Sequence, residues 1–545
     1  MKKWTILVSI LIISALLLFS TVANLSYPLL WNDEALGIML TKSTLHGGYP
    51  RVYFQGNILN QFHRDLLKPL VDQETGASKE NGWLAYYIGA PFVALSERID
   101  NIYLQTGIVR LPFAIIGFAS IFIFGAIARL FFSQGGQKRN SFFLVLFLSL
   151  IDIPLLLHIR EARYYSVLLF IVGFYWYVLL RYVLFNTISY RLFLFLMPVV
   201  CLAIFLTYPP AVFPSLGILF IASGIFQRRI RKPTLKSLLP FMAAIVVTSP
   251  AFLFFDIFHL AELTAKIYHV TPLMVYKNIV TITSRIYADT LLMFVGLGIG
   301  VAILLVKTNR ASTSLRFFLL FSFLVAIFGV GTLATLSRIP FVFTRYYIYL
   351  YPLVTISAVI AIITIRELPL PKKSLIWKKS TLFFLLCIMV FNLTIHNGGE
   401  KARRIAGYIF QLTHRYEGPL DVIIPYILAH FSTPQKLIIA TNYEEFSYMY
   451  YLRSRVTVGF MGINLEEDLK TTADIIVYRP GWGTDPNIFR YFLSKDTYDE
   501  VTFPIFNYPL NNIPEFYFGY PHQFRTLYAK KEEEKVRIFV RRGSI

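Results

Sequence analysis

Long runs of apolar residues recur along roughly the first 400 positions of the chain, and short polar segments separate them. The runs cover residues 4–23, 107–132, 141–157, 165–182, 191–207, 210–226, 237–255, 289–306, 317–336, 347–365 and 380–396. An α-helix needs roughly 17–25 residues to cross the hydrocarbon core of a bilayer. The pattern therefore predicts a mainly α-helical, polytopic membrane protein with about eleven transmembrane helices.

The first run, residues 4–23, contains no charged residue and has two interpretations. The apolar region of a cleavable signal peptide is only about 7–15 residues long, and this run is longer. Similar runs also follow it along the chain. We therefore expect a retained transmembrane helix rather than a signal peptide.

Short segments rich in Lys and Arg separate several of the runs. They are residues 1–3, 137–140, 227–232, 307–316 and 366–379. Cytoplasmic loops of membrane proteins carry an excess of Lys and Arg, so the number of crossings between two such segments is even. This rule predicts a cytoplasmic N-terminus. It also places the first loop (24–106), the turn at 159–165 and the segment 337–346 together on the outer face.

A shorter apolar run, residues 83–95, has no crossing to make under this rule. Between the basic segments 1–3 and 137–140 only two crossings fit, and the runs 4–23 and 107–132 supply them. Apolar runs of about 10–14 residues are more often interfacial or re-entrant than spanning. We expect residues 83–95 to lie at the outer face of the membrane.

Residues 397–545, called the tail below, have a different pattern, with charged residues throughout and no run long enough to cross a bilayer. Strands are predicted at 436–441, 456–460, 474–478 and 537–540, and a helix at 443–452. Such alternation predicts a small α/β unit with a partly parallel sheet. We expect two domains, 1–396 in the membrane and 397–545 as an extracytoplasmic soluble domain. The tail has no Gly-rich phosphate loop, which argues against nucleotide binding.

The composition supports a membrane protein, and the positions of the charged residues explain the net charge without a nucleic-acid partner. The chain has 545 residues, of which 56% are hydrophobic and 15% charged, whereas globular domains have about 25% charged residues. The net charge of +21 does not indicate a nucleic-acid partner, because most Lys and Arg lie in the short loops between spans. Cys201 and Cys387 lie within apolar runs, so no disulfide is expected.

Two adjacent carboxylates, Asp33 and Glu34, follow the first span closely. A carboxylate fixed at a helix start beside the bilayer is suited to accept the proton of an attacking hydroxyl, as a general base. A solvated helix boundary is one alternative. A helix N-cap, formed by Asn32 or Asp33, is a second alternative that is compatible with catalysis.

The segment 158–166, HIREARYYS, places several ionisable groups between two spans. A charged side chain at the bilayer centre costs about 2.5–3.5 kcal/mol, so such groups often have a function. Glu161 is suited to position an acceptor hydroxyl or neutralise a neighbour, and Arg163 to hold a phosphate oxygen. The alternative is that these side chains snorkel to the interface.

A third candidate is Arg345, which stands just before the tenth span and is followed by four tyrosines within six positions. An aromatic belt with a snorkelling Arg is one interpretation. The functional interpretation is a guanidinium that binds an anionic lipid head group, with Arg338 as a second donor. No zinc-type ligand spacing is present, and we expect neither metal nor cofactor, although a gathering of His46, His63 and Asp65 stays open.

Taken together, the motifs resemble the C-type fold of membrane glycosyltransferases, and more narrowly the protein O-mannosyltransferase and aminoarabinose-transferase branch. The resemblance covers roughly the first 400 residues. It rests on the order and common side of the stretches 31–35 (WNDEA), 110–112 (RLP), 161–165 (EARYY) and 345–352 (RYYIYLYP).

This resemblance implies a sugar donor built on a polyprenyl phosphate. Asp33 matches the catalytic base of the family, Glu34 its neighbour, and Arg345 the position that holds the carrier phosphate. Residues 79–87 stand where the family often has a Pro-Pro-Leu-Tyr-Tyr-like sequence, and both prolines are missing here. That difference weakens any transfer of donor contacts to this segment.

We therefore expect an integral membrane glycosyltransferase that moves a sugar, with inversion, from a lipid-phosphate donor to a hydroxyl of a lipid, glycan or protein. The expected location is the outer face of a cell membrane, the bacterial inner membrane above all. An oligosaccharide ligase of related architecture, a lipid or polysaccharide transporter and an inactive scaffold are the alternatives. Transporter sites usually lie at the midplane, whereas the ionisable groups here lie at one face.

Overall fold

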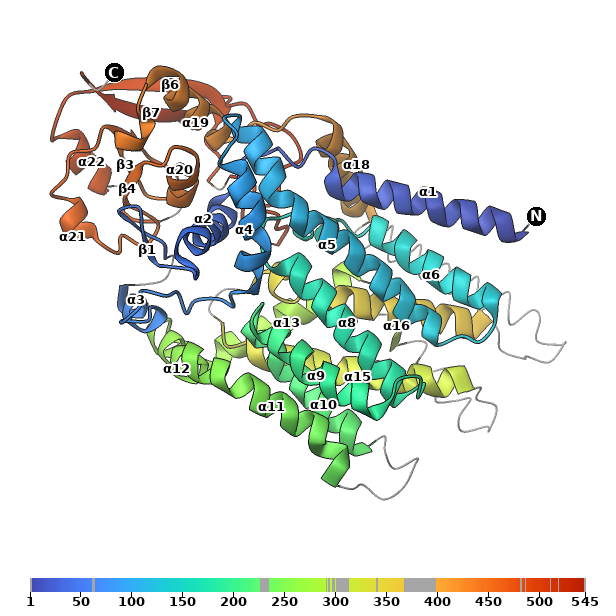
Figure 1. Cartoon of the computed structure of the whole chain (residues 1–545). Helices are drawn as coiled ribbons and strands as arrows, with labels where there is room; N and C mark the ends of the chain where they lie inside the picture. Colours follow the sequence, from blue (N-terminus) through green and yellow to red (C-terminus); the bar gives the residue numbers. More distant parts are fainter. Residues whose placement is uncertain are drawn as a thin grey trace.

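The computed structural model describes residues 2–60, 64–225, 235–290, 313–339, 342–366, 398–480, 483–485, 487–509, 511–517 and 519–543, with Leu292, Val295, Gly296 and Ile299. A bundle of long helices makes up one part, and the tail lies at one end of that bundle (Figure 1). The structure is mostly helical, as the sequence predicts.

The bundle consists of apolar helices that run side by side (Figure 1). They are α1 (Lys2–Val22), α5 (Ile102–Leu130), α6 (Gly135–Leu150), α7 (Ile153–His158), α8 (Tyr165–Val183), α9 (Tyr190–Phe205), α10 (Val212–Ile225), α11 (Leu235–Phe255), α15 (Thr313–Leu336) and α16 (Leu350–Arg366). Among the described residues, four are long and apolar enough to cross a membrane by length and composition, namely those at 102–130, 165–183, 237–255 and 315–336. The chain is a multi-pass membrane protein.

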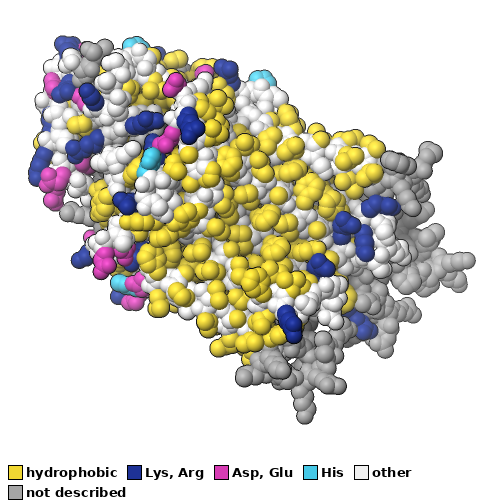
Figure 2. Space-filling view, in the orientation of Figure 1, with side chains coloured by type: hydrophobic (Ala, Val, Ile, Leu, Met, Phe, Trp, Pro, Cys, Tyr) yellow, Lys and Arg dark blue, Asp and Glu magenta, His cyan; other side chains and the backbone are white. Residues whose placement is uncertain are grey.

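The predicted number of eleven spans stays a prediction, because the run 380–396 and most of 289–306 lie outside the described residues. Figure 2 shows a broad apolar face along the bundle, with mixed charges around the tail and Lys and Arg at the far end. That distribution fits the basic loops expected on the cytoplasmic side. The orientation itself stays a prediction.

One predicted span differs from the structure in detail. The run 141–157 is not one helix, because α6 ends at Leu150 and α7 begins after Asp152. The Asp152 carboxylate accepts the backbone N–H of Leu155 at 3.1 Å and so caps the new helix, which also has Pro154 in its first turn. The break brings the chain to the turn 159–164 at the end of the bundle next to the tail.

Short elements of the connecting loops lie at the end of the bundle that is nearer the tail (Figure 1). They are α2 (Asn32–Gly47), the strands β1 (Tyr53–Phe54) and β2 (Asn57–Ile58), α3 (Arg64–Leu70), α4 (Leu84–Ser96), α12 (Ile257–Ile267) and α13 (Pro272–Asp289). Helix α4 corresponds to the apolar run 83–95, which is predicted to lie at the outer face of the membrane. It packs against α2 and α5. Gly89 allows this close packing, since a Cβ there would lie 3.2 Å from Thr41.

The tail contains a five-stranded sheet with the order β4-β3-β5-β7-β6. Its elements are α18 (Gly398–Thr413), α19 (Pro419–His430), β3 (Ile438–Thr441), α20 (Glu445–Tyr451), β4 (Arg455–Val458), α21 (Leu465–Asp468), β5 (Ile475–Val477), α22 (Asn487–Leu493), β6 (Tyr498–Phe506) and β7 (Lys535–Arg541). β3 pairs in parallel with β4 and β5, while β7 pairs antiparallel with β5 and β6. The predicted partly parallel sheet is present, but β6 was not predicted.

The tail holds the start of α2 through several hydrogen bonds. The backbone N–H of Leu29 donates to the Asp421 carboxylate at 3.1 Å, and that of Leu30 donates to the Tyr451 hydroxyl at 3.0 Å. The Ser447 hydroxyl donates to the Leu30 carbonyl at 2.8 Å. One hydrophobic cluster also runs from the bundle into the tail. The tail is thus packed directly against the segment that carries Asp33.

Candidate active site

Helix α2 begins at Asn32, immediately after an extended residue, Trp31, with φ −76° and ψ 168°. No side chain caps it, so the predicted cap by Asn32 or Asp33 is wrong. The Asn32 amide oxygen instead accepts the backbone N–H of Phe446 in the tail at 3.3 Å. The carboxylates of Asp33 and Glu34 lie in the first turn, where the positive end of the helix dipole favours negative charge.

Asp33 lies between two guanidinium groups from distant parts of the chain. Its Oδ2 is 2.9 Å from Nη1 of Arg163, in the turn before α8, and 3.2 Å from Nη2 of Arg345, in the 3-10 turn η3 (Thr344–Tyr346). The side chains of the three residues are 14%, 12% and 5% exposed, respectively. The three residues predicted from separate loops therefore form one cluster, called the Asp33 cluster below.

The Asp33 cluster leaves buried hydrogen-bond donors unused. Nε and Nη1 of Arg345 are both buried without a hydrogen-bond partner, as is the indole Nε1 of Trp31. The Arg345 guanidinium carbon lies 5.0 Å from the centre of the Trp31 ring, and that of Arg163 lies 5.8 Å from it. Because leaving a buried donor unsatisfied is costly, and two guanidinium charges face one carboxylate, the cluster is suited to bind an anion.

Glu34 has a different environment, although it is the next residue. It is 1% exposed and forms a forked pair with Arg110 of α5, with N–O distances of 2.9 and 2.5 Å. Its Oε1 also accepts the backbone N–H of Ala162 at 2.9 Å. The remaining Arg110 donor binds the carbonyls of Leu25 and Pro28. Glu34 thus joins α2, α5 and the turn that carries Arg163, which makes it a positioning residue.

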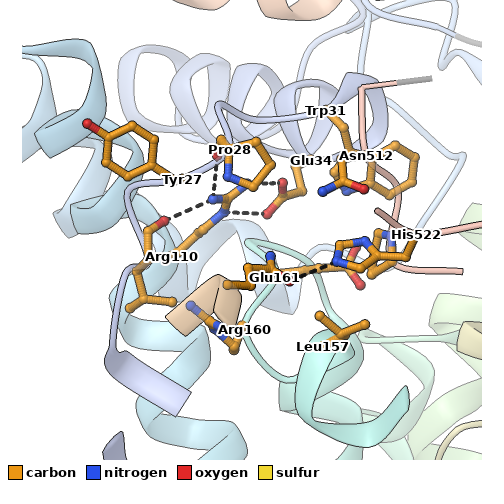
Figure 3. Close-up of a pocket in the computed structure, with 13 residues that line it drawn as sticks. Tyr27, Pro28, Trp31, Glu34, Arg110, Leu157, Arg160, Glu161, Asn512 and His522 are labelled. Atoms are coloured by element: carbon orange, nitrogen blue, oxygen red, sulfur yellow. Dashed lines mark hydrogen bonds and ion pairs between the residues drawn. The ribbon is translucent and has the colours of Figure 1, made fainter. Parts of the chain in front are cut away.

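Glu161 points into an interior cavity of about 40 Å³ (Figure 3). Trp31, Glu34 and Arg110 also line this cavity, which is much smaller than the roughly 300–1,000 Å³ of ligand pockets. Oε1 of Glu161 lies 2.6 Å from Nδ1 of His158. Burial raises the pKa of Glu161 well above its usual range, and the Glu34 carboxylate raises it further.

A second hollow opens beside Asp33 itself. It is lined by residues of α2, of the first loop and of the turn before α8, namely Asp33, Leu36, Gly37, Thr41, Asn81, Ala85, Tyr86, Phe113, Ala162, Arg163 and Tyr164. Glu80 lies near it, and burial raises the pKa of Glu80 to about 7, while the Arg163 charge opposes that change. Asn81 and Tyr86 come from the segment 79–87, to which no donor contact was assigned from the sequence.

Arg338 does not belong to the Asp33 cluster. It follows α15, and its side chain is exposed. The nearer support for Arg345 comes instead from the tail, since both carboxylate oxygens of Glu515 lie 3.1 Å from the backbone N–H of Thr344. Sequence reasoning missed Glu515 because it lies in a tail segment without any recognisable motif.

Within the described parts of the chain, no group of three or more His, Cys, Asp or Glu residues is placed to hold a metal ion. His46 is 51% exposed and lies 3.4 Å from Glu97. His63, the other histidine of the predicted gathering, lies outside the described residues.

No family model matches the chain, and no curated protein is significantly similar to it in sequence. Among solved structures, the chain is similar to ArnT from Cupriavidus metallidurans bound to undecaprenyl phosphate, with a TM-score of 0.48, 10% identity and 98% of each chain covered. It is also similar to the apo oligosaccharyltransferase of Archaeoglobus fulgidus, with a TM-score of 0.45 and 12% identity, over 84% of this chain and 65% of that one.

Proposed function

We propose that this protein is a membrane glycosyltransferase that takes a sugar from a polyprenyl-phosphate donor and transfers it to an acceptor hydroxyl at the outer face of the membrane. One observation carries the proposal. At the end of the bundle next to the tail, Asp33 is held between Arg163 and Arg345, and buried donors of Arg345 have no partner. The acceptor belongs to a lipid, a glycan or a protein, and the membrane to a bacterial cell.

The two arginines supply the binding site for the donor phosphate. A guanidinium presents a fork of N–H donors that matches phosphate oxygens, and Arg345 has Nε and Nη1 available for such a contact. In the resting site the Asp33 carboxylate occupies part of this fork. A phosphate that binds Arg345 weakens its contact with Asp33 and leaves the carboxylate available as a base.

The reaction is a single displacement. The acceptor oxygen attacks the anomeric carbon while Asp33 removes its proton, and the bond between that carbon and the phosphate oxygen breaks. The electron pair leaves with the polyprenyl phosphate, where Arg345 and Arg163 oppose the negative charge that develops. Attack from the side opposite the leaving group inverts the anomeric configuration.

The donor class is tested with the purified full-length protein. We expect it to transfer a labelled sugar from a polyprenyl-phosphate sugar but not from a nucleotide sugar, and the anomeric signal in the NMR spectrum of the product to be inverted. Transfer from the nucleotide sugar alone would contradict the proposal. A retained configuration would contradict the single displacement.

The outer location is tested by labelling single cysteines in intact cells. Glu74 in the first loop is exposed and Gln137 in the first turn of α6 is half-buried, and the two lie on opposite sides of the predicted membrane. A membrane-impermeant reagent added from outside should label Glu74→Cys and not Gln137→Cys. The opposite pattern would place the Asp33 cluster in the cytoplasm.

A further inference from the structure

A second pocket lies away from the Asp33 cluster, where the parallel strand β4 ends and the first loop meets the tail. Its enclosed volume is about 70 Å³, compared with about 40 Å³ for the cavity at Glu161, and it is open to solvent on one side. Residues 56–60 of the first loop form one wall and residues 455–464 of the tail form the other. Ligands of α/β sheets commonly bind at the carboxyl ends of parallel strands.

The two walls are fixed by direct hydrogen bonds. The Asn57 side-chain oxygen accepts the backbone N–H of Val456 at 2.9 Å, and its amide nitrogen donates to the Ser454 carbonyl at 3.1 Å. The hairpin of β1 and β2 is thereby attached beside β4, as Figure 1 shows. The pocket is therefore built jointly by the two parts of the chain.

The carboxyl group of Glu445 contributes to the lining of the pocket. Glu445 is 4% exposed, and its Oε1 accepts the backbone N–H of Phe460 at 3.3 Å, whereas its Oε2 is buried without a hydrogen-bond partner. Burial raises the pKa of Glu445 to about 7, so near neutral pH it can accept or donate a hydrogen bond.

The backbone beside the pocket is also strained. Val458, a β-branched residue, has φ +73°, and its N–H donates to the Asp468 carboxylate at 2.8 Å. Side chains of this type rarely adopt positive φ, and such outliers concentrate at ligand-binding sites.

The chemistry of the lining indicates the class of ligand. Amides and carboxylates (Asn57, Asn60, Glu445, Asn464, Asp468) stand beside the ring of Phe460, and Arg455 is the sole Lys or Arg among the lining residues. Two carboxylates disfavour an anion. Hydroxyl-rich ligands are bound by such groups because they both donate and accept hydrogen bonds.

The pocket is linked to the Asp33 cluster by aromatic side chains. The Phe460 ring lies 5.7 Å from that of Tyr443, and both belong to the cluster formed with Trp31. Burial raises the pKa of Tyr443, and the charge of Asp33 raises it further. We propose that this pocket binds the carbohydrate portion of the glycosyl acceptor; its role as an acceptor subsite rests on the proposed glycosyl transfer.

The test measures binding of simple sugars to the full-length protein by saturation-transfer NMR, without donor. The probes are the methyl pyranosides of glucose, galactose and mannose, and N-acetylglucosamine. At least one should bind, and Glu445→Gln should lower its affinity about tenfold or more, as expected for loss of a hydrogen bond to a charged group. Gln retains an oxygen for the Phe460 N–H, so the loop is kept.

The matched control is Glu74→Gln, the same change at an exposed glutamate outside the pocket, which should leave binding unchanged. Asn464→Ala, at an exposed lining position, provides a second variant with a smaller loss if Glu445→Gln does not fold. Absence of binding by all four sugars, or equal binding by wild type and both pocket variants, would overturn the inference. Polyprenyl-phosphate binding is measured on the same samples, and its absence in the wild type would refute the proposed function separately.

Discussion

The first turn of α2 carries two carboxylates in contrasting ion-pair clusters. In the Glu34 cluster every nitrogen of Arg110 has a partner, and Glu34 accepts hydrogen bonds from both a guanidinium and a backbone N–H. In the Asp33 cluster, Arg345 contacts Asp33 through Nη2 while Nε and Nη1 remain buried without partners. A saturated cluster fixes the position of elements, whereas an unsaturated one is prepared for a ligand.

This comparison predicts opposite consequences for fold and function. Arg110→Met should destabilise the protein strongly, by about 3–5 kcal/mol, because it leaves the Glu34 carboxylate buried and uncompensated. Arg345→Met should cost much less, because Asp33 keeps Arg163 and is more exposed. Thermal unfolding of both variants in the same detergent measures the difference. Equal losses of stability would contradict the division into two kinds of cluster.

Asp33 and Glu34 should also differ in their effects on the rate of transfer. Asp33→Asn preserves the volume and removes the proton acceptor, so transfer should fall about 10²–10⁴-fold, the usual contribution of a general base, with donor binding largely kept. Glu34→Gln should lower the rate less, mainly through displacement of the turn that carries Arg163. Turnover numbers at saturating donor measure both effects. Full activity in Asp33→Asn would refute its role as the base.

Much of the Asp33 cluster could be predicted from the sequence. Asp33, Arg163 and Arg345 lie at helix ends. The distribution of Lys and Arg in the loops predicts that these ends lie on the same face of the membrane, and this prediction needs no knowledge of how the helices pack. The charge of Arg110 inside an apolar span indicated a special role for this residue. Its partner, Glu34, could not be predicted because the pairing depends on how the helices pack.

Other features depend on contacts that no local pattern encodes. Strand β6 contains two adjacent acids and Pro504, and only one of its nine residues is fully buried, so it lacks the apolar run used to predict its neighbours. Glu515 and the pocket at Glu445 arise where the tail docks on the first loop. Such docking joins residues hundreds of positions apart, and propensity and spacing carry no information about it.

The tail's support of Arg345 gives a smaller predicted effect. Glu515→Ala removes the acceptor of the Thr344 N–H and should weaken donor binding by about tenfold, the usual size for a hydrogen bond to a charged group. Glu515→Gln keeps one acceptor oxygen and should recover most of the affinity. The donor concentration that gives half-maximal rate should rise while the turnover number changes little. An effect on turnover alone would argue against a positioning role.

The central claim is that Arg345 holds the phosphate of a lipid donor, and binding of polyprenyl phosphate to purified protein tests it most directly. Arg338 offers a matched control, an exposed arginine seven residues before Arg345 in the same segment 337–346. Arg345→Ala should lower the affinity at least tenfold, Arg345→Lys should recover part of it, and Arg338→Ala should bind like the wild type. Unchanged affinity in Arg345→Ala, or an equal loss in Arg338→Ala, would contradict the account.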